Sequence, residues 1–299
     1  MRSLKGKTII LGVTGSVAAI KSAQLARLLK KEGATVRAVL TESGRQMLSK
    51  QQRSKLEKET GKPLQSQLFT NNVKKHVERE AQRKARGLHV DLAEKADLLL
   101  IAPATANTIA NLSHGKTQDE HGNADLLHTI HLGMEPYKLA IAPAMHQQMW
   151  KHPATRKNLK ILEKRGAKII RPVSGKLASG DIGEGRMQEP KEIVRAVKKQ
   201  LTIQESLKGK KILVNAGPTR VFIDEVRFIS NPFSGALGHE IAKEAAKRGA
   251  EVVLLQGKSG KHVPPELEDL NVKCEYFDEP LETRRGVPSL MELMKKHVG

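Results

Sequence analysis

The sequence predicts an α/β protein with a doubly wound parallel sheet, followed by a second, partial Rossmann-like domain. Three observations predict this class: a strand–helix–strand unit at the start, continuous apolar runs further along, and a repeat of the opening pattern in the last third. The 299 residues are enough for two ordinary domains. Aromatic residues make up only 3% of the chain, so Val, Ile, Leu and Ala must build the core.

The first strand–helix–strand unit opens the chain. Residues 7–15, "KTIILGVTG", form a β-rich run that turns at glycine, which predicts a strand. Residues 16–33 have helical spacing and stop at a glycine, and residues 34–41 predict a second strand. Because two such strands in one sheet are joined by a right-handed crossover, this unit predicts a parallel sheet.

The middle of the chain alternates polar segments with apolar runs. Residues 42–88 are polar and predict helices, with a break at 60–63. Residues 96–105 and 137–145 are continuously apolar, which is typical of central parallel strands covered on both faces. Residues 157–172 then predict a helix, a glycine turn and a further strand.

The opening pattern returns in the last third of the chain. "LKGKKILVNAGPT" (207–219) echoes "LKGKTIILGVTGS" (4–16), and residues 234–257 repeat the order helix, glycine, strand. Residues 271–277 indicate a third strand, and a helix follows at the end. This second copy is short for a complete doubly wound domain, so the sequence predicts a partial one.

The boundary between the two copies lies near 190–206, where "PKEIVRAVKKQLTIQES" indicates a final helix and a linker. We therefore expect a first domain over residues 1–190, a linker over 191–206 and a second domain over 207–299.

The formal net charge is +20, and such a charge attracts phosphate groups, whether on a nucleotide, a substrate or a nucleic acid. The basic residues are dispersed, however, and a segment such as 74–87 mixes both signs. The sequence lacks a basic patch interleaved with aromatic residues of the kind that binds single strands. We favour solvated basic faces and keep nucleic-acid binding as the weaker alternative.

The compartment is indicated by cysteine usage and by apolar run length. Cys274 is the only cysteine, which excludes an intrachain disulfide framework and fits a reducing cytoplasm. The sequence has no apolar run near the roughly 20 residues that a membrane span needs. The apolar start leads straight into a glycine turn, so we interpret it as a strand and not as a signal peptide.

Two strand ends carry motifs typical of ligand binding. "GVTGSVAAIK" (12–21) places glycine and hydroxyl residues before a helix, where backbone N–H groups and the helix dipole favour an anion. It lacks the lysine spacing of a P-loop and the third glycine of the dinucleotide fingerprint, so by itself it also fits an ordinary turn. "PATANT" (103–108) ends a buried strand, and ligands of α/β proteins bind at that edge of the sheet.

Together with further motifs, these segments resemble a known family. The additional motifs are "HVDLAEKADLLLIAPATANTIANLSHG" (89–115), "PAMHQQMW" (143–150), "GDIGEGRMQEP" (180–190) and "AGPTRVFIDEVRFISNPFSGALG" (216–238). Their order resembles the flavoprotein cysteine decarboxylases, and more closely the bifunctional phosphopantothenoylcysteine decarboxylase/phosphopantothenate–cysteine ligase family of coenzyme A biosynthesis. The resemblance covers nearly the whole chain. It implies a flavodoxin-like flavoprotein domain that binds FMN and phosphopantothenoylcysteine, followed by the N-terminal part of a ligase domain.

The resemblance implies a set of FMN-binding residues. Gly15 and Ser16 match the turn that holds the FMN phosphate. The positions that match residues near the flavin ring are Thr41, Ala104, Thr105, Asn107 and Asp125. An insertion-like stretch, 116–123, precedes Asp125 and makes that match less secure.

The resemblance also implies catalytic and substrate-binding residues. His89 matches the active-site histidine that would orient and deprotonate the substrate thiol, whereas the residue alone also fits a helix cap or a surface position. Met145, His146 and Met149 fall in the substrate clamp, with His146 where the family usually has an asparagine that holds the departing carboxylate. Ser179 replaces a cysteine that acts as a proton donor in the bacterial members.

The substrate clamp also has a simpler interpretation. Met145, Met149 and Trp150 fit an apolar plug that would seal the pocket against water.

His128 and His131 have the spacing of a metal-binding pair, but no carboxylate or cysteine partner is evident. We expect them on a helix surface or in an oligomer contact, and we expect no metal site.

The second domain departs further from the family. Asn231 matches the residue that helps to activate the phosphopantothenate carboxylate. The positions that match the nucleotide-phosphate loops are Gly217, Thr219, Ser234, Gly235 and Gly238, with Phe233 and Ala236 as changes. The later segments that bind CTP are not found in this sequence, so we expect no complete ligase site. Mg²⁺ with CTP or ATP is implied only if the ligase half is completed.

The sequence thus predicts FMN-dependent decarboxylation of 4'-phospho-N-pantothenoylcysteine to 4'-phosphopantetheine by a cytoplasmic protein that forms a homotrimer or a higher homo-oligomer. The alternative is a flavin-binding regulatory or subunit protein that lacks full catalysis, which the changes at His146 and Ser179 would allow.

Overall fold

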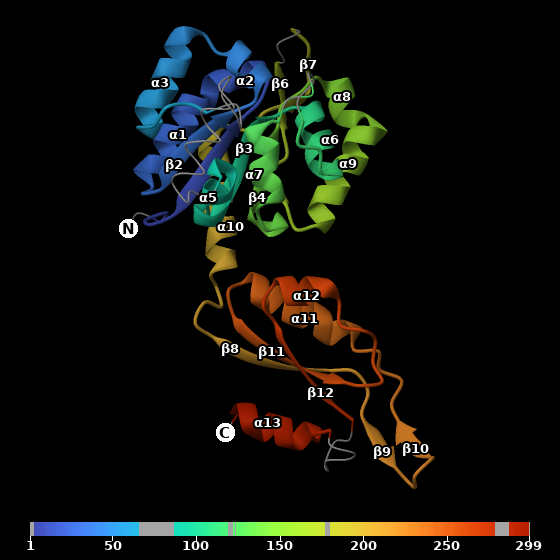
Figure 1. The fold of residues 1–299 in the computed structure, drawn as a ribbon. Helices are drawn as coiled ribbons and strands as arrows, with labels where there is room; N and C mark the ends of the chain where they lie inside the picture. The colour runs from blue at the N-terminus through green and yellow to red at the C-terminus, as the bar shows by residue number, and fades with distance from the viewer. Residues whose placement is uncertain are drawn as a thin grey trace. The chain divides into compact units, whose positions relative to one another are not determined.

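The computed structural model describes residues 3–65, 87–118, 122, 124–176, 180–278 and 287–298. The chain divides into two compact units, Met1–Leu201 and Thr202–Gly299 (Figure 1). This division falls within 191–206, the interval expected to hold a final helix and a linker.

The first unit is built on a five-stranded parallel sheet, so the predicted doubly wound sheet is confirmed. The strands have the order β2-β1-β3-β4-β5. Their bounds are β1 Thr8–Val13, β2 Thr35–Leu40, β3 Leu98–Ala104, β4 Leu139–Pro143 and β5 Lys168–Ile169. The chain leaves β1 toward one side for β2 and toward the other for β3. In sheets of this order, ligands bind at the carboxyl ends of the strands at such a switch point.

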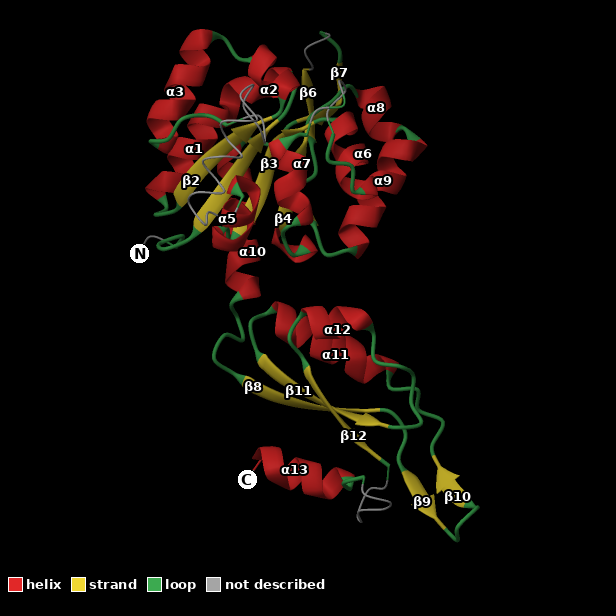
Figure 2. Cartoon of the chain, in the orientation of Figure 1, coloured by secondary structure: helices red, strands yellow, loops and turns green. Residues whose placement is uncertain are grey.

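Helices cover both faces of this sheet (Figure 2). In chain order they are the 3₁₀ helix η1 Val17–Lys21, α1 Ser22–Lys31, α2 Glu42–Met47, α3 Lys50–Thr60, α5 Leu88–Lys95, α6 Ala106–His114, α7 Leu126–Leu132, the 3₁₀ helix η2 Pro136–Lys138, α8 Gln147–Lys151, α9 Pro153–Lys164 and α10 Pro190–Gln204. The break expected at 60–63 is the end of α3, where Gly61 adopts a left-handed conformation that suits glycine. Most of the rest of 42–88 lies outside the described residues.

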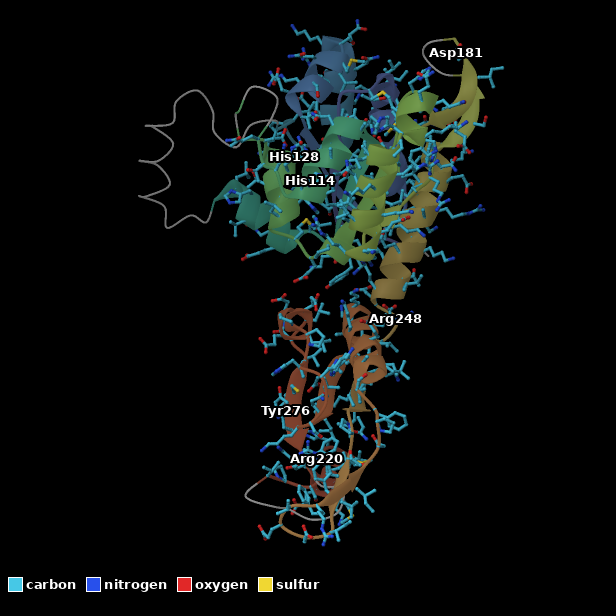
Figure 3. All side chains as sticks on the ribbon, turned by 90° about the vertical axis from the view of Figure 1, so that its right-hand side faces the viewer. His114, His128, Asp181, Arg220, Arg248 and Tyr276 are labelled. Carbon is cyan, nitrogen blue, oxygen red and sulfur yellow. The ribbon has the colours of Figure 1, made fainter. Side chains whose placement is uncertain are left out.

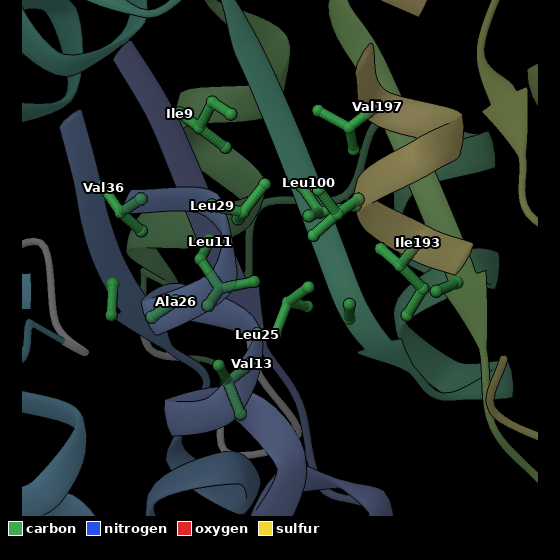
Figure 4. Packing of buried hydrophobic residues seen from close by; sticks show 14 of the residues in the cluster. Ile9, Leu11, Val13, Leu25, Ala26, Leu29, Val36, Leu100, Ile193 and Val197 are labelled. Atoms are coloured by element: carbon green, nitrogen blue, oxygen red, sulfur yellow. The ribbon is translucent and has the colours of Figure 1, made fainter. Parts of the chain in front are cut away.

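Among the described residues of the first unit, two apolar clusters form the core, one on each face of the sheet. Because side chains alternate along a strand, Leu11 of β1 belongs to one cluster and Ile10 to the other. The first cluster includes Leu25 of α1 together with Ile193 and Val197 of α10 (Figure 4). Helix α10 is therefore part of the core of the first unit, although it lies largely in the segment assigned to the linker.

A small antiparallel hairpin follows β5. It consists of β6 Val173–Lys176 and β7 Ile182–Arg186. Part of this region belongs to the motif at 180–190, but no strand was predicted in it, because the alternating glycines and polar residues of "IGEGR" show no apolar period.

The second unit has its own parallel sheet of three strands in the order β12-β11-β8, so the third strand of this unit is confirmed. The bounds are β8 Lys211–Ala216, β9 Arg220–Phe222, β10 Phe228–Ser230, β11 Glu251–Gly257, β12 Lys273–Phe277, α11 Ala236–Lys247, α12 Pro265–Asp269 and α13 Leu290–Val298. Strands β9 and β10 form a separate antiparallel hairpin. In the part of the chain that is described, no helix is both long and apolar enough to span a bilayer.

Candidate functional site

The hydroxyl of Thr14 joins the ends of β1 and β3. Its Oγ1 donates to the carbonyl of Pro103 at 2.8 Å and accepts from the amide of Thr105 at 3.1 Å. Thr14 is fully buried. These bonds place the turn after β1 directly beside the turn after β3, at the switch point of the sheet. Thr14 was not among the predicted site residues, although a hydroxyl directly after an apolar strand was a usable signal.

The turn after β1 is shaped to accept an anion. A Cβ on Gly15 would lie 2.7 Å from Cβ of Ser43, so the close approach of α2 requires glycine there. The hydroxyl of Ser16 caps η1 by accepting from the amide of Ala18 at 3.4 Å. Among the hydrogen bonds that described residues make, the amides of Gly15 and Val17 have no acceptor. The turn therefore offers N–H groups and a hydroxyl at the start of a helical segment.

Thr41 and Thr105 both act as helix caps at this edge. Oγ1 of Thr41 accepts from the amide of Gly44 at 3.0 Å, which starts α2 next to Gly15. Oγ1 of Thr105 accepts from the amide of Thr108 at 3.2 Å and starts α6. Two of the predicted ring-binding residues thus first serve to orient helices toward the switch point.

Ala104 and Asn107 complete the predicted group at the end of β3. Ala104 is fully buried as the last residue of the strand, whereas Asn107 is exposed in the first turn of α6. A small buried residue and an exposed carboxamide at this edge suit a flat ligand that needs close approach and a hydrogen bond.

The segment after β4 lies against β7. The amide of Met145 donates to the carbonyl of Gly185 at 3.0 Å. His146 caps α8, because its Nδ1 accepts from the amide of Gln148 at 3.3 Å. Nε2 of the same ring lies 3.5 Å from Oδ2 of Asp181. Asp181, which is labelled in Figure 3, lies at the end of the hairpin. His146 and Asp181 therefore face each other across two segments that are distant in sequence.

The apolar plug expected from Met145, Met149 and Trp150 is only partly present. Trp150 is 3% exposed and packs in the core beneath α8, with the guanidinium of Arg156 4.1 Å from its ring centre. Met145 packs against the same cluster, but Met149 is 48% exposed. Trp150 and Met145 thus anchor the segment, and Met149 does not seal it.

An ion pair connects the turn after β1 with the end of the hairpin. Nζ of Lys21 donates to both carboxylate oxygens of Glu189, at 3.0 and 3.1 Å. Glu189 also contacts the guanidinium of Arg186. The hydrogen bond from Lys21, with the charges of both basic side chains, lowers the pKa of the Glu189 carboxyl. The pair holds two of the predicted motifs side by side.

His89 is not part of this group. It lies at the second position of α5, where a Cβ on Gly87 would meet its ring carbon Cε1 at 2.9 Å. In the described part of the chain, no hydrogen bond or ion pair joins His89 to the strand ends. Ser179, the other predicted proton donor, lies outside the described residues.

Asp125 is buried and caps α7, accepting from the amide of His128 at 2.9 Å. The expectation that His128 and His131 lie on a helix surface is wrong, because both are buried in the unit. Burial, followed by the nearby charge of His128, lowers the pKa of His131 to about 4. No group of three metal-ligating side chains is found within the described ranges.

In the second unit, the structure brings together the glycines predicted to hold a nucleotide. Gly217 and Gly235 both have positive φ, and a Cβ on Gly235 would lie 2.9 Å from the amide nitrogen of Gly217. Gly238 packs against Ala216, where a Cβ would be 2.5 Å from that of the alanine.

The remaining predicted residues of this unit lie at the same edge. Nδ2 of Asn231 donates to Oγ1 of Thr219 at 3.4 Å, and the carbonyl of Ser234 accepts from the amide of Lys261 at 2.9 Å. This loop cluster lies at the start of α11, at the carboxyl ends of β8 and β11.

Comparison with family models gives two matches. Residues 1–202 match the model described as "Flavoprotein", and residues 207–276 match the model described as "DNA/pantothenate metabolism flavoprotein C-terminal domain".

Among curated proteins, the chain is similar to the "Coenzyme A biosynthesis bifunctional protein CoaBC" of several bacteria. It is 39% identical to that of Vibrio parahaemolyticus over 272 residues, which are 91% of this chain and 63% of the relative. The Escherichia coli protein is also 39% identical, over 90% of this chain and 62% of the relative. The chain therefore spans about three-fifths of the length of these relatives.

Solved structures resemble the first unit. A "PPC decarboxylase mutant" complexed with pantothenoylaminoethenethiol has a TM-score of 0.53 and 32% identity, covering 64% of this chain and 97% of the other. "The FMN binding protein AtHal3" has a TM-score of 0.52 and 33% identity, covering 65% of this chain and 96% of the other.

Proposed function

This chain belongs to the flavoprotein family, and from that premise we propose that its first unit binds FMN and decarboxylates 4'-phospho-N-pantothenoylcysteine to 4'-phosphopantetheine. The observation that carries the proposal is the Thr14 bridge, which sets the anion-accepting turn beside the end of β3. The names of the similar proteins support the substrate and the cofactor.

The residues at the switch point fit FMN. The turn amides of Gly15 and Val17 and the hydroxyl of Ser16 would hold its phosphate. The end of β3 and the start of α6 would flank its ring, with Asn107 as a hydrogen-bonding side chain. Thr41 and Asp125 cap neighbouring helices and would position these groups. FMN, when bound, supplies the electron acceptor that a cysteine carboxylate lacks.

The protein itself would bind and orient the substrate. In the proposed reaction His89 accepts the thiol proton, and Nε2–H of His146 holds the carboxylate that departs as CO₂. Met145 anchors the His146 segment through its bond to Gly185, while Met149 and Ser179 are assigned to the substrate side by the family pattern alone.

We propose a homotrimer or a higher homo-oligomer, with the site completed between copies. One observation supports it: the apolar side chains of Val17, Ile20 and Met47 are exposed beside the turn. Exposed apolar side chains of this kind are typical of interaction surfaces. Light scattering of the purified FMN-loaded chain should give a mass of three chains or more, and a monomer would contradict this assembly.

The second unit is proposed to hold the first part of a nucleotide-dependent phosphopantothenate–cysteine ligase site. Its glycine cluster supports a phosphate-binding loop, with Asn231 beside it. Mg²⁺ with CTP or ATP belongs to this proposal only for a completed ligase domain. We place both activities in the cytoplasm, a reducing compartment that Cys274 as the only cysteine favours.

The proposal is tested by purifying the chain with FMN and supplying phosphopantothenoylcysteine. A flavin absorption spectrum that stays with the protein, together with decarboxylated product detected by mass spectrometry, is the expected result. The His89→Asn variant should keep the flavin and lose the product. A wild-type chain that retains no flavin would contradict the proposal.

A flavin-binding regulatory or subunit protein is the second candidate. It is favoured by His146, which stands where the family usually has an asparagine. The same experiment separates the two: bound flavin without any product from this substrate would support the regulatory function and exclude the decarboxylase.

A further inference from the structure

We infer that Asp181 competes with the carboxylate of the substrate for the Nε2–H of His146, an inference that rests on the function proposed above. Asp181 would thereby weaken the binding of carboxylate-bearing ligands without affecting ligands that lack this group. Three features of the described residues carry this inference: the face of β7 on which Asp181 lies, the hydrogen bond that fixes the His146 ring, and the exposure of the pair.

The glycines of β7 bring Asp181 to His146. A Cβ on Gly183 would lie 1.8 Å from Oε1 of Gln147, and a Cβ on Gly185 would lie 2.1 Å from the carbonyl oxygen of Met145. Both glycines are buried, whereas the residues between and beside them are exposed. Side chains two residues apart share one face of a strand. Asp181 precedes Gly183 by two residues, so it lies on the face that packs on residues 145–147.

The cap of α8 decides which nitrogen of His146 faces Asp181. The amide of Gln148 donates to Nδ1 at 3.3 Å, so Nδ1 acts as the acceptor. The proton of the neutral imidazole is then on Nε2, which lies 3.5 Å from Oδ2 of Asp181. The ring therefore presents one N–H, and the carboxylate of Asp181 already faces it.

The pair is weak enough to be displaced. The side chains of His146 and Asp181 are 37% and 68% exposed, and exposed pairs of this kind are weak because water screens them. One N–H cannot fully serve two carboxylates, and two carboxylates beside it repel each other. A substrate carboxylate that shares this donor is held loosely, which does not oppose a reaction that removes the carboxylate.

The test uses two ligands that differ only in the carboxylate. Phosphopantothenoylserine and its decarboxylated counterpart carry a hydroxyl in place of the thiol, so neither can follow the thiol chemistry. Their dissociation constants are measured on the FMN-loaded chain by calorimetry or by the fluorescence of Trp150, the only tryptophan, which follows His146 in α8.

The Asp181→Asn variant should bind the serine ligand about two- to fivefold more tightly and the decarboxylated ligand unchanged. The matched control is Glu184→Gln, which removes the same charge from an exposed residue on the other face of β7 and should change neither constant. In a His146→Ala background, Asp181→Asn should no longer affect the serine ligand.

Weaker or unchanged binding of the serine ligand by Asp181→Asn would overturn the inference, as would an equal change for both ligands. A persistent effect in the His146→Ala background would overturn it as well. If the wild-type chain binds neither ligand, the proposed function itself fails, and the inference falls with it.

Discussion

Thr14 ties the ends of two strands together with one buried hydroxyl group. Replacing it by valine removes that hydroxyl and leaves the amide of Thr105 and the carbonyl of Pro103 without their partner. A buried polar group left unsatisfied costs about 1–3 kcal/mol. We expect Thr14→Val to lower the free energy of unfolding by about that amount and to weaken FMN binding.

Chemical denaturation and flavin titration measure both effects. Thr14→Ser is the matched control, because it keeps the hydroxyl and should remain close to the wild type. A valine variant as stable as the serine variant, with the same affinity for flavin, would contradict the structural role of this hydroxyl.

His131 makes the first unit sensitive to acid. Its pKa is lowered from 6.5 to about 4, first by burial and then by the charge of His128. Between these pH values the unfolded chain takes up a proton that the folded chain does not, so stability falls as the pH falls through this window. The shift corresponds to a loss of about 3 kcal/mol by pH 4.

We expect His131→Gln to flatten the dependence of unfolding free energy on pH between about 6.5 and 4. Denaturation midpoints over this range measure the slope. The exposed His262 provides a control, since His262→Gln should leave the slope as in the wild type. Equal slopes for the wild type and His131→Gln would show that burial of this histidine has no such effect.

Some residues of the site could be predicted from the sequence, and others were missed or misplaced. Gly15 and Thr105 could be singled out because family motifs contain them, and the structure places both at the switch point. Asp181 was missed although its motif was quoted, because its role depends on strand β7, which has no apolar period. His128 and His131 were misplaced because a polar pair at helical spacing gives no sign of burial.

At the scale of elements, β7 depends on glycines. Gly185 has φ of 139°, and a Cβ there would lie 2.1 Å from the carbonyl oxygen of Met145. Gly180 also has a positive φ, of 93°, but a Cβ there would meet no described residue within 4 Å. An alanine at Gly180 would therefore suffer only backbone strain, whereas an alanine at Gly185 would suffer backbone strain and steric overlap.

We expect Gly180→Ala to cost about 1 kcal/mol, the usual penalty of a positive φ, and Gly185→Ala to cost clearly more. The second variant should also separate β7 from the segment 145–147 and weaken substrate binding. Thermal unfolding and substrate titration measure these changes, and equal costs for the two variants would contradict the close packing.

The main strands and helices were largely predictable, because continuous apolar runs and helical spacing depend on burial in a sheet covered on both faces. The β6–β7 and β9–β10 hairpins were not, since their short strands are held by contacts with distant segments and not by their own pattern. The same is true of the pairing between Lys21 and Glu189, which are close only in the folded unit.

At the scale of the whole molecule, the sequence predicted two α/β units from the repeated opening pattern. The structure adds that α10, from the interval assigned to the linker, packs in the core of the first unit. The buried side chains Ile193, Val197 and Leu201 of α10 gave a helical apolar period, but a period alone does not tell which of two units a helix joins. Which unit α10 joins depends on which of the two sheets has a face that no other helix covers.

We propose that this chain, with FMN at the β1–β3 switch point, removes the carboxylate of phosphopantothenoylcysteine. The most direct measurement is the release of labelled CO₂ from substrate labelled in its cysteine carboxyl group. We predict release by the FMN-loaded wild-type chain and none by His89→Asn with the same flavin content. Flavin-loaded wild-type protein that releases no label would contradict the claim.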